Sequence, residues 1–374
     1  MNILHINVSY IMSALHQTMI DHLNEHDQHN KVFVPTYDKK RSIIKEKEYA
    51  TILECFKKWD RLFYFKKQRK IIDAAIDTYD IGSFDLIHAY TLFTDGNTAM
   101  ELSKKYGVPY VVAVRNTDVN DFFKKMVHLR AHGVKILKNA KAVFFLSPAY
   151  RDYVIEKFIP DSEKQDIINK SYVIPNGIDD FWLQNSLERD FNTFNQNISQ
   201  RKLNILYVGG IDANKNVETS LKALELLQKE GWNVSFKAIG KVVEQSIYSR
   251  LLQYPFFHYE PSKEKEQLIH SYRGADIFIM PSIHETFGLV YAEAMSQGLP
   301  VIYTKGQGFD RQFEDGCVGY AVNPRSPDDI VEKIKFIVKD YEGISSRATD
   351  SSTIFDWHKI TKRYCDIYQQ SCKK

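Results

Sequence analysis

Short runs of consecutive apolar residues alternate along this chain with stretches whose apolar positions recur three or four residues apart. The clearest case is residues 275–302, where 277–280 is an unbroken apolar run of the kind that forms a strand buried on both faces. From Gly288 the apolar positions follow helical spacing, Gly298 provides a stop, and 299–302 opens another buried run. This stretch therefore predicts a strand–helix–strand unit of a parallel sheet.

The same alternation extends over most of the chain and predicts an α/β protein. A length of 374 residues is too great for one ordinary core and suits two α/β domains. Strands are expected at 3–8, 31–35, 84–89, 110–114, 142–147, 172–175, 204–208 and 234–239. Helices are expected from 15 to 23 and at 149–158, 217–228, 264–272 and 357–370, and one after Ser326 and Pro327, an N-cap followed by a first-turn proline.

The loop between the first strand and the helix of the 275–302 unit has the composition of a ligand site. Loops at the carboxyl ends of parallel strands face the ligand crevice of an open sheet. Gly288 permits close backbone approach, and the first amides of the helix can hold a phosphate or pyrophosphate. Glu285 then suits the hydroxyls of a sugar, and Glu293, eight positions later, a second set. The alternative is that both glutamates are solvated surface charges.

The run PSIHETFGLVYAEAMSQGLPVI, residues 281–302, closely resembles the E-x7-E signature of the retaining nucleotide-sugar glycosyltransferases of the GT-B fold, the glycogen-synthase-like family 4 type. The segment YVIPNGID at 172–179 resembles a second hallmark of that family. The resemblance implies an α/β GT-B fold, in which two Rossmann-like domains face a central cleft. The implied organisation is an acceptor-side domain at 1–182 with the last helix, 357–374, packed back on it, a linker at 183–201, and a nucleotide-sugar-binding domain at 202–356.

The resemblance also implies roles for individual residues in the second domain. Glu285 would meet hydroxyls of the donor sugar, and Glu293 would meet the nucleotide ribose. The diphosphate would meet the backbone amides of Phe287, Gly288 and Leu289.

A glycine turn, Gly209 and Gly210, follows the strand at 204–208, and Lys215 matches the lysine that neutralises the diphosphate in the family. Gly210 stands where relatives commonly have an arginine, so one cation is missing. Each preorganised donor at a leaving group can be worth about 3 kcal/mol, so the loss matters. Three residues are candidates to replace that charge: Lys241, Lys305 and Arg115.

The first domain departs from the family pattern in two places. The loop after its first strand lacks the usual glycine pair, although Ser9 and Tyr10 are still expected on the acceptor side. Arg115 replaces a frequent histidine; an arginine cannot act as a base near neutral pH, but it can hold a phosphate or carboxylate bidentately. We expect Arg115 and Asp118 on the acceptor side of the cleft, and His88 as a packed strand-end residue rather than a catalyst.

Positive charge is concentrated in residues 38–70. The whole chain carries +3, but this segment has twelve Lys and Arg against five Asp and Glu, a net charge of +7, so the remainder is net acidic. The aromatic residues Phe56, Trp59, Phe63, Tyr64 and Phe65 are interleaved with these charges. A helix of this composition suits an anionic membrane surface with a lipid-linked acceptor, or an acidic polymer or partner protein. The alternative is a solvated helix packed on the core; nucleic acid is disfavoured, because no binding module accompanies the charge.

The cysteines and the start of the chain predict the compartment. Four cysteines, far apart or terminal, form neither a C-x-x-C pair nor a disulfide framework, which favours a reducing compartment and argues against a structural metal. The chain begins with a strand-like run rather than a signal segment, and no apolar stretch approaches the length of a membrane span. We expect a cytoplasmic protein, peripheral at the inner face of the membrane if the basic segment binds lipid.

These observations predict a retaining glycosyltransferase of polysaccharide biosynthesis that moves a sugar from a nucleotide diphosphate-sugar, with UDP-sugar favoured. The acceptor would be a saccharide, cell-surface glycan, lipid-linked saccharide or protein. The catalytic contributions are assigned to Glu285, Lys215 and Arg115, with no cofactor and no metal. The alternative, favoured by the departures at Gly210 and Arg115, is a non-catalytic subunit that binds acceptor or stabilises a partner glycosyltransferase. A sugar-phosphate synthase or epimerase on the same fold is a third reading.

Overall fold

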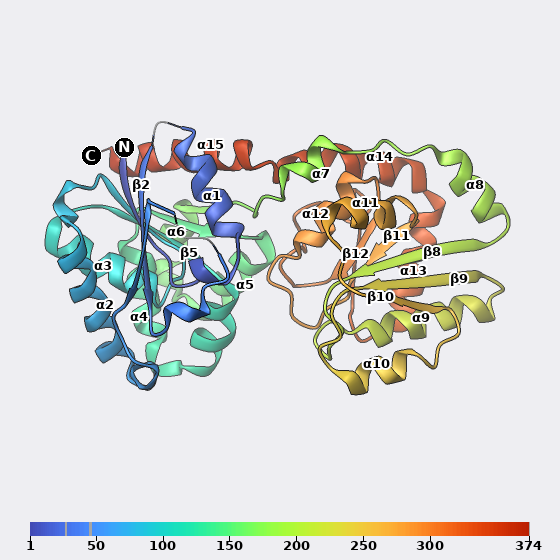
Figure 1. The fold of residues 1–374 in the computed structure, drawn as a ribbon, viewed down its shortest axis with the longest axis horizontal. Helices are drawn as coiled ribbons and strands as arrows, with labels where there is room; N and C mark the ends of the chain where they lie inside the picture. Colours follow the sequence, from blue (N-terminus) through green and yellow to red (C-terminus); the bar gives the residue numbers. More distant parts are fainter. Residues whose placement is uncertain (27, 45–46, 374) are drawn as a thin grey trace. The chain divides into compact units, whose positions relative to one another are not determined.

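The computed structural model describes residues 1–26, 28–44 and 47–373, so Lys45 and Glu46 of the basic segment and the last residue, Lys374, lie outside it. The chain forms two compact units, each built on a parallel sheet (Figure 1). The first unit comprises Met1–Leu146, Tyr150–Pro175 and Trp357–Lys374, and the second comprises Ser147–Ala149 and Asn176–Asp356. No helix of the described residues combines the length and the apolar character needed to cross a bilayer.

The first unit is organised by a seven-stranded parallel sheet in the order β3-β2-β1-β4-β5-β6-β7. The strands are β1 (Asn2–Ile6), β2 (His29–Thr36), β3 (Ala50–Glu54), β4 (Leu86–Ala89), β5 (Tyr110–Val114), β6 (Ala142–Phe145) and β7 (Ser171–Val173). The strand order reverses between β1 and β4, and the carboxyl ends of strands at such a switch point are where open α/β sheets bind ligands.

Side chains alternate between the two faces of this sheet, so two separate cores form. Leu4 and Ile6 join one core and Ile3 joins the other, as the period of two in a strand requires. The first core packs against helices α2 (Tyr64–Thr78), α3 (Asp95–Tyr106) and α4 (Arg130–Asn139), and also includes residues of α5 (Pro148–Phe158) and α6 (Asp161–Asn169). The second packs against α1 (Leu15–Asn24) and α15 (Trp357–Cys372).

Helix α15 comes from the far end of the chain, and it lies beside α1 in the first unit (Figure 1). Its apolar stripe is Trp357, Ile360, Tyr364 and Ile367, and all four side chains are buried in the second core of this unit. The spacing of these residues places them on one face of a helix, which explains why the segment returns to this sheet.

The basic segment does not form a single helix. Residues 50–54 form β3, which pairs in parallel with β2, a 3₁₀ turn covers Lys58–Leu62, and α2 begins only at Tyr64. The expected helix is therefore wrong for most of 38–70. The short strand ATILE escaped notice because two charged runs flank it, although its β-branched residues fit an edge strand.

The second unit has a six-stranded parallel sheet in the order β10-β9-β8-β11-β12-β13. Its strands are β8 (Lys202–Val208), β9 (Asn233–Ile239), β10 (Phe257–Glu260), β11 (Ile277–Ile279), β12 (Val301–Thr304) and β13 (Gly319–Val322). Its helices include α7 (Asp180–Gln184), α9 (Val217–Lys229), α10 (Gln245–Leu251), α11 (Lys265–Arg273), α12 (Leu289–Ser296), α13 (Pro327–Lys339) and α14 (Tyr341–Ser352). The order reverses between β8 and β11, which places a second switch point at their carboxyl ends.

Residues 183–201, expected as a linker, lie inside the second unit and contain helix α8 (Phe191–Ser199). The ring of Phe194 is buried and stacks on the ring of Tyr341. The guanidinium of Arg189 donates hydrogen bonds to the carbonyls of Tyr272, Ala275 and Gln297. One aromatic ring and one multidentate cation therefore attach a segment whose Asn- and Gln-rich composition resembles a flexible connection.

Helix α13 shows local sequence signals that hold in the structure. The hydroxyl of Ser326 accepts the N–H of Asp329 at 3.2 Å, and Pro327 occupies the first helical position. The cap satisfies an amide that has no partner within the helix, which explains why the sequence fixes this boundary closely.

Gly240, directly after β9, lies where the ends of β8 and β9 pack too closely for a side chain. A Cβ at Gly240 would lie 2.0 Å from the carbonyl oxygen of Gly209, which directly follows neighbouring β8. We expect Gly240→Ala to destabilise these strand ends by roughly 1–3 kcal/mol, measured as faster amide hydrogen exchange in β8 and β9. The matched control is Gly274→Ala, whose Cβ would stand 3.4 Å from the nearest backbone oxygen. Equal exchange in the two variants would contradict this packing.

Candidate active site

The first cluster of candidate residues lies at the carboxyl ends of β8 and β11 in the second unit. The Lys215 ammonium and the Glu285 carboxylate form an ion pair with an Nζ–Oε2 distance of 2.6 Å. Both side chains are largely withdrawn from solvent, with 24% of Lys215 and 12% of Glu285 exposed. Glu285 also accepts the N–H of Thr286 at 3.0 Å and the hydroxyl of Ser282 at 3.4 Å. The two side chains expected to meet a diphosphate and a sugar are therefore adjacent.

Asn214 joins the two loops that carry this pair. Its amide nitrogen donates to the carbonyl of His284 at 2.9 Å, and its amide oxygen accepts the N–H of His284 at 3.0 Å. Its backbone carbonyl accepts the N–H of Ile283 at 2.8 Å. Three hydrogen bonds from one residue thus hold the loop after β11 against the loop after β8, beside Lys215.

Asn216 supplies the second attachment on the other side of Lys215. It adopts a left-handed backbone conformation, with φ 55°, which asparagine tolerates better than most residues. Its amide donates to the carbonyls of Pro281 at 3.0 Å and Pro324 at 2.6 Å. Sequence reasoning missed both asparagines; the available signal was an asparagine on each side of the lysine that matches the family motif.

Gly288 begins α12 in a conformation that requires glycine. Its φ is +78°, and a Cβ there would lie 2.4 Å from the ring of Tyr291. Tyr291 is buried, and its hydroxyl donates to the carbonyl of Met280 at the end of β11. Among the described residues, no acceptor pairs with the amides of Phe287, Gly288 or Leu289. These three amides lie at the start of a helix, where the dipole favours an anion.

The loop after β12 holds the Glu285 loop in place. The side chain of Gln307 accepts the N–H of Glu285 at 3.0 Å, and the carbonyl of Glu285 accepts the N–H of Gly308 at 3.0 Å. A Cβ at Gly308 would lie 1.8 Å from the carbonyl oxygen of Thr286, so only glycine permits this approach. These contacts tie the loop after β12 to the backbone of the site.

Glu293 lies on α12 in a different environment from Glu285. The hydroxyl of Tyr272 donates to its carboxylate at 3.0 Å. Burial raises the pKa of Glu293 from the ordinary 4.5 to about 7; the Tyr272 hydrogen bond opposes this shift and the charge of Asp179 adds to it. The group is therefore divided between its neutral and ionised forms near neutral pH.

Two of the three candidate cations that would replace the missing arginine, Lys241 and Lys305, lie at the surface of the second unit. Lys241 and Lys305 are exposed, and in the described residues no side-chain hydrogen bond or ion pair joins either to Glu285. The carbonyl of Gly210 accepts the hydroxyl of Tyr207 at 2.6 Å, which fixes the glycine turn. A Cβ at Gly210 would lie 3.2 Å from the side chain of Val243, which is 58% exposed.

In the first unit, Asp118 is committed to the backbone. Its buried carboxylate accepts the N–H groups of Leu92 at 2.9 Å, Phe93 at 3.1 Å and Arg115 at 2.8 Å. Burial raises the pKa of Asp118 to about 6, and the three hydrogen bonds oppose that shift. Asp118 therefore positions the loop after β4 against the end of β5. The half-buried Arg115 donates from Nε to the carbonyl of Tyr90 at 3.3 Å.

Two other expectations for the first unit have opposite outcomes. The side chain of Tyr10 is fully buried, and its hydroxyl donates to that of Tyr49 at 3.3 Å, so the expected acceptor-side contact is wrong for this side chain. The apolar turn Tyr10–Met12 draws it into the core, whereas neighbouring Ser9 is half-buried. His88 is buried with its Nδ1 2.7 Å from the Tyr368 hydroxyl, and burial lowers its pKa well below 6.5. It is a packed residue, as predicted.

Sequence reasoning also missed Asp95, the first residue of α3. Its buried carboxyl accepts the N–H of Val8 at 3.2 Å and the hydroxyl of Thr91 at 2.9 Å. Burial raises the pKa of Asp95 to about 8. An aspartate at a helix start normally indicates a surface cap, so the sequence carried no signal of a buried carboxyl that is mostly neutral at pH 7.

The two parallel Rossmann-like sheets, together with the comparisons with known proteins, define a glycosyltransferase of the GT-B class. Residues 17–180 match the model of Glycosyltransferase Family 4, and residues 188–350 match that of Glycosyl transferases group 1. The chain belongs to glycosyltransferase family 4, a retaining family.

Curated relatives cover most of the chain at low identity. D-inositol 3-phosphate glycosyltransferase of Paenarthrobacter aurescens is 25% identical, covering 78% of this chain and 74% of its own length. Glycogen synthase of Mycobacterium tuberculosis is 22% identical over 76% of this chain and 68% of its own.

Solved structures agree in fold. Sucrose-phosphate synthase from Thermosynechococcus elongatus superposes with a TM-score of 0.76 at 18% identity, covering 99% of this chain and 98% of that one. HepE of Anabaena, solved with UDP and glucose, has a TM-score of 0.67 at 18% identity, with 99% and 100% covered.

The raised pKa of Glu293 makes stability depend on pH. Between about pH 4.5 and 7 the folded protein retains a proton that the unfolded chain has lost, so the contribution of this group to stability falls as pH rises through that window. We expect carboxyl carbon NMR to show Glu293 titrating near 7, and Tyr272→Phe to raise that pKa further. A Glu293 pKa of 4.5 or lower would contradict this environment.

Proposed function

We propose that this protein is a retaining glycosyltransferase that transfers a sugar from a UDP-sugar to an acceptor bound by the first unit. The observation that carries the proposal is the Lys215–Glu285 ion pair beside the unpaired amides of Phe287, Gly288 and Leu289. UDP is favoured because HepE was solved with UDP-glucose, and the Escherichia coli trehalose-6-phosphate protein was solved with UDP-2-fluoro glucose.

The ion pair gives each side chain a role when the donor binds. The diphosphate competes with Glu285 for Lys215 and takes hydrogen bonds from the amides at the start of α12. Glu285, released from its cation, accepts hydroxyl groups of the donor sugar. Glu293, in its ionised form, accepts the hydroxyls of the ribose. The charge of the leaving group is then balanced by an ammonium and helix amides, so the proposal requires no metal.

In the proposed reaction, the bond between the anomeric carbon and the diphosphate oxygen breaks as an acceptor oxygen bonds to the same face of that carbon. The acceptor proton passes to the leaving phosphate oxygen, so no side chain must act as a base. This sequence fits Arg115, which cannot accept a proton near neutral pH. We assign Arg115 and Ser9 to the acceptor side, and Gly209, Gly210 and Lys241 to the diphosphate side.

A second candidate function rests on Gly210. Because the family's usual arginine is missing and Lys215 is already neutralised by Glu285, the chain could be a non-catalytic subunit that binds acceptor or supports a partner glycosyltransferase. The two functions differ at the donor site, since only the enzyme needs to bind a nucleotide-sugar.

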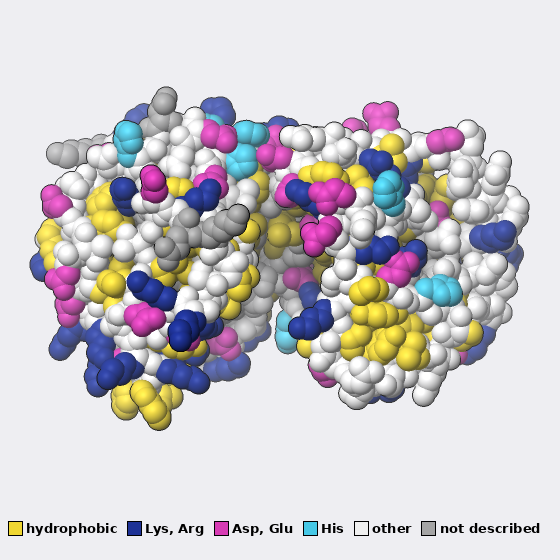
Figure 2. Space-filling view, in the orientation of Figure 1, with side chains coloured by type: hydrophobic (Ala, Val, Ile, Leu, Met, Phe, Trp, Pro, Cys, Tyr) yellow, Lys and Arg dark blue, Asp and Glu magenta, His cyan; other side chains and the backbone are white. Residues whose placement is uncertain are grey.

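The acceptor we propose is a saccharide or cell-surface glycan, including one linked to lipid at the cytoplasmic face of a membrane. Support comes from the corner between the 3₁₀ turn Lys58–Leu62 and α2, where Trp59 and Leu62 are 75% and 78% exposed. Exposed Lys57, Lys58 and Lys66 are close to them in the chain. Figure 2 shows yellow hydrophobic side chains bordered by dark-blue Lys and Arg at the lower edge of the unit that contains β1. Such a surface suits anionic lipid headgroups.

Nucleotide binding tests the donor site. Calorimetric titration should show saturable binding of UDP or a UDP-sugar, about micromolar in Kd, and weaker binding of GDP. Glu293→Ala should weaken it about tenfold, because hydrogen bonds to a charged group are lost. Binding should persist in EDTA.

The matched control is Glu264→Ala, an exposed glutamate of the same unit whose removal should change nothing. If neither nucleotide nor nucleotide-sugar binds, the enzyme proposal fails and the non-catalytic subunit takes its place.

Vesicle sedimentation tests the membrane contact. We expect anionic vesicles to bind the protein more strongly than neutral ones, with about 1 kcal/mol lost per reversed charge. Reversing Lys57 and Lys58 to glutamate, or replacing Trp59 by alanine, should reduce that binding. Reversing Lys229 and Lys339, exposed lysines of the second unit, provides the control. Equal sedimentation with neutral and anionic vesicles would rule out the contact.

A further inference from the structure

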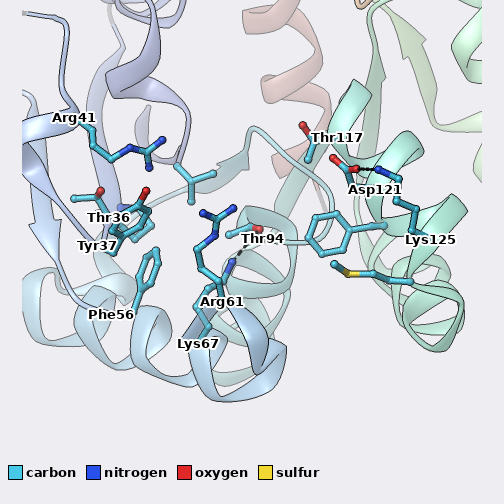
Figure 3. Close-up of a pocket in the computed structure, with 14 residues that line it drawn as sticks. Thr36, Tyr37, Arg41, Phe56, Arg61, Lys67, Thr94, Thr117, Asp121 and Lys125 are labelled. Carbon is cyan, nitrogen blue, oxygen red and sulfur yellow. Dashed lines mark hydrogen bonds and ion pairs between the residues drawn. The ribbon is translucent and has the colours of Figure 1, made fainter. Parts of the chain in front are cut away.

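The first unit contains a cavity of about 400 Å³ that none of the roles above uses (Figure 3). It is lined by residues that follow the carboxyl ends of several strands, among them Val8 after β1, Thr94 after β4 and Thr117 after β5. Thr36 ends β2. The cavity therefore lies at the edge of the sheet where open α/β folds bind ligands, next to the switch point between β1 and β4.

Four cations line this cavity, Arg41, Arg61, Lys67 and Lys125, and the first three come from three different elements (Figure 3). Among the described residues, no carboxylate lies within ion-pair distance of Arg41, Arg61 or Lys67. The acid closest to them in the chain, Asp60, is bound by Lys70 at 2.6 Å. The cavity's own acid, Asp121, is bound by Lys125 at 2.5 Å.

Aromatic rings hold the cations in the cavity wall. The Arg41 guanidinium lies 4.8 Å from the centroid of the Tyr37 ring, and Arg61 lies 5.9 Å from the same ring. The Lys67 ammonium lies 5.7 Å from the ring of Phe56 and 3.5 Å from the hydroxyl of Thr94. Cation–π contacts orient a charge without neutralising it, so the positive field of the cavity remains.

Lys67 lies in a partly desolvated environment. Burial lowers the pKa of its ammonium, whereas an ion pair would raise it. The buried carboxyl of Asp95 is the acid that acts on it, but its own pKa is raised to about 8, so at pH 7 it is mostly neutral. Because the Lys67 ammonium is poorly solvated, an anion brought into the cavity stabilises its charged form more than it would stabilise that of an exposed lysine.

We propose that this cavity binds a phosphoryl group carried by the acceptor, with Arg41, Arg61 and Lys67 as its ligands. Two guanidinium forks and one ammonium match the oxygens of a phosphate, and hydroxyls of Thr36 and Thr94 can complete the shell. The apolar lining, Phe56, Phe122 and Met126, suits the body of the acceptor beside the anion. That the bound molecule is an acceptor rests on the proposed transferase function; the binding of phosphate to the cavity does not. Two kinds of acceptor carry such a phosphoryl group: a soluble sugar phosphate and a lipid-linked saccharide.

The test uses inorganic phosphate as the probe, titrated into the full-length protein at constant ionic strength. Because the donor site would also bind phosphate, the titration is run in the Lys215→Ala variant, whose donor site is weakened whether or not the transferase proposal holds. We expect saturable binding, about tenfold weaker in Arg41→Gln and in Lys67→Gln. Lys67→Arg should retain it, and Lys105→Gln on the end of α3 is the matched control.

Vesicles of phosphatidylglycerol distinguish the two sources of the phosphoryl group. Loss of phosphate binding in the Arg41 and Lys67 variants with unchanged vesicle binding indicates a soluble phosphorylated acceptor. Loss of both indicates a lipid-linked one. Circular dichroism confirms that the variants fold. Absence of saturable phosphate binding, or binding that Arg41→Gln and Lys67→Gln leave unchanged, overturns the proposal, and nucleotide titration reports separately on the donor site.

Discussion

The second unit depends on one ion pair, that of Lys215 and Glu285, which joins the loops at the ends of β8 and β11. Two charges withdrawn from water gain little net stability from each other, but removing either leaves the other uncompensated. The pair is therefore better understood as a constraint on geometry than as a source of stability. Asn214 and Asn216, on either side of the lysine, keep the loops in register. In the proposed mechanism an incoming diphosphate replaces Glu285 as the partner of Lys215, and Glu285 then accepts sugar hydroxyls, so neither charge lacks a partner.

The first unit arranges its charges in the opposite way. The carboxylate of Asp118 accepts three backbone N–H groups, and Asp60 forms an ion pair with Lys70. The acids near the ligand edge are thus occupied or neutral, while Arg41 and Lys67 keep unneutralised charge. A unit built this way attracts an anion, whereas the proposed donor site of the second unit holds one ammonium and one carboxylate as an ion pair.

Local signals predicted much of this structure. Alternating runs located most strands, Ser326 and Pro327 fixed the start of α13, and the glycine at 288 marked a helix start with a left-handed backbone. The sequence could not show contacts between distant residues. Arg189 attaches the segment expected as a linker through carbonyls more than eighty residues away, and the hydroxyl of buried Tyr10 donates to that of Tyr49. The role of Asn214 and Asn216 depends on their hydrogen bonds to the loop after β11, a contact between distant residues that the sequence does not show.

The glycine at position 210 changes how the proposed donor site must stabilise a diphosphate. The hydroxyl of Tyr207 donates to the carbonyl of Gly210 and fixes the turn in which the family's usual arginine is missing. With one cation fewer, the proposed diphosphate site relies more heavily on Lys215 and on amides oriented by Gly288. Such amides are fixed dipoles that need no reorganisation as charge develops on the leaving group. Their alignment depends on a backbone conformation open only to glycine, with the ring of Tyr291 filling the space of a Cβ. The electrostatics of the site therefore rest on backbone geometry more than on the number of its charged side chains.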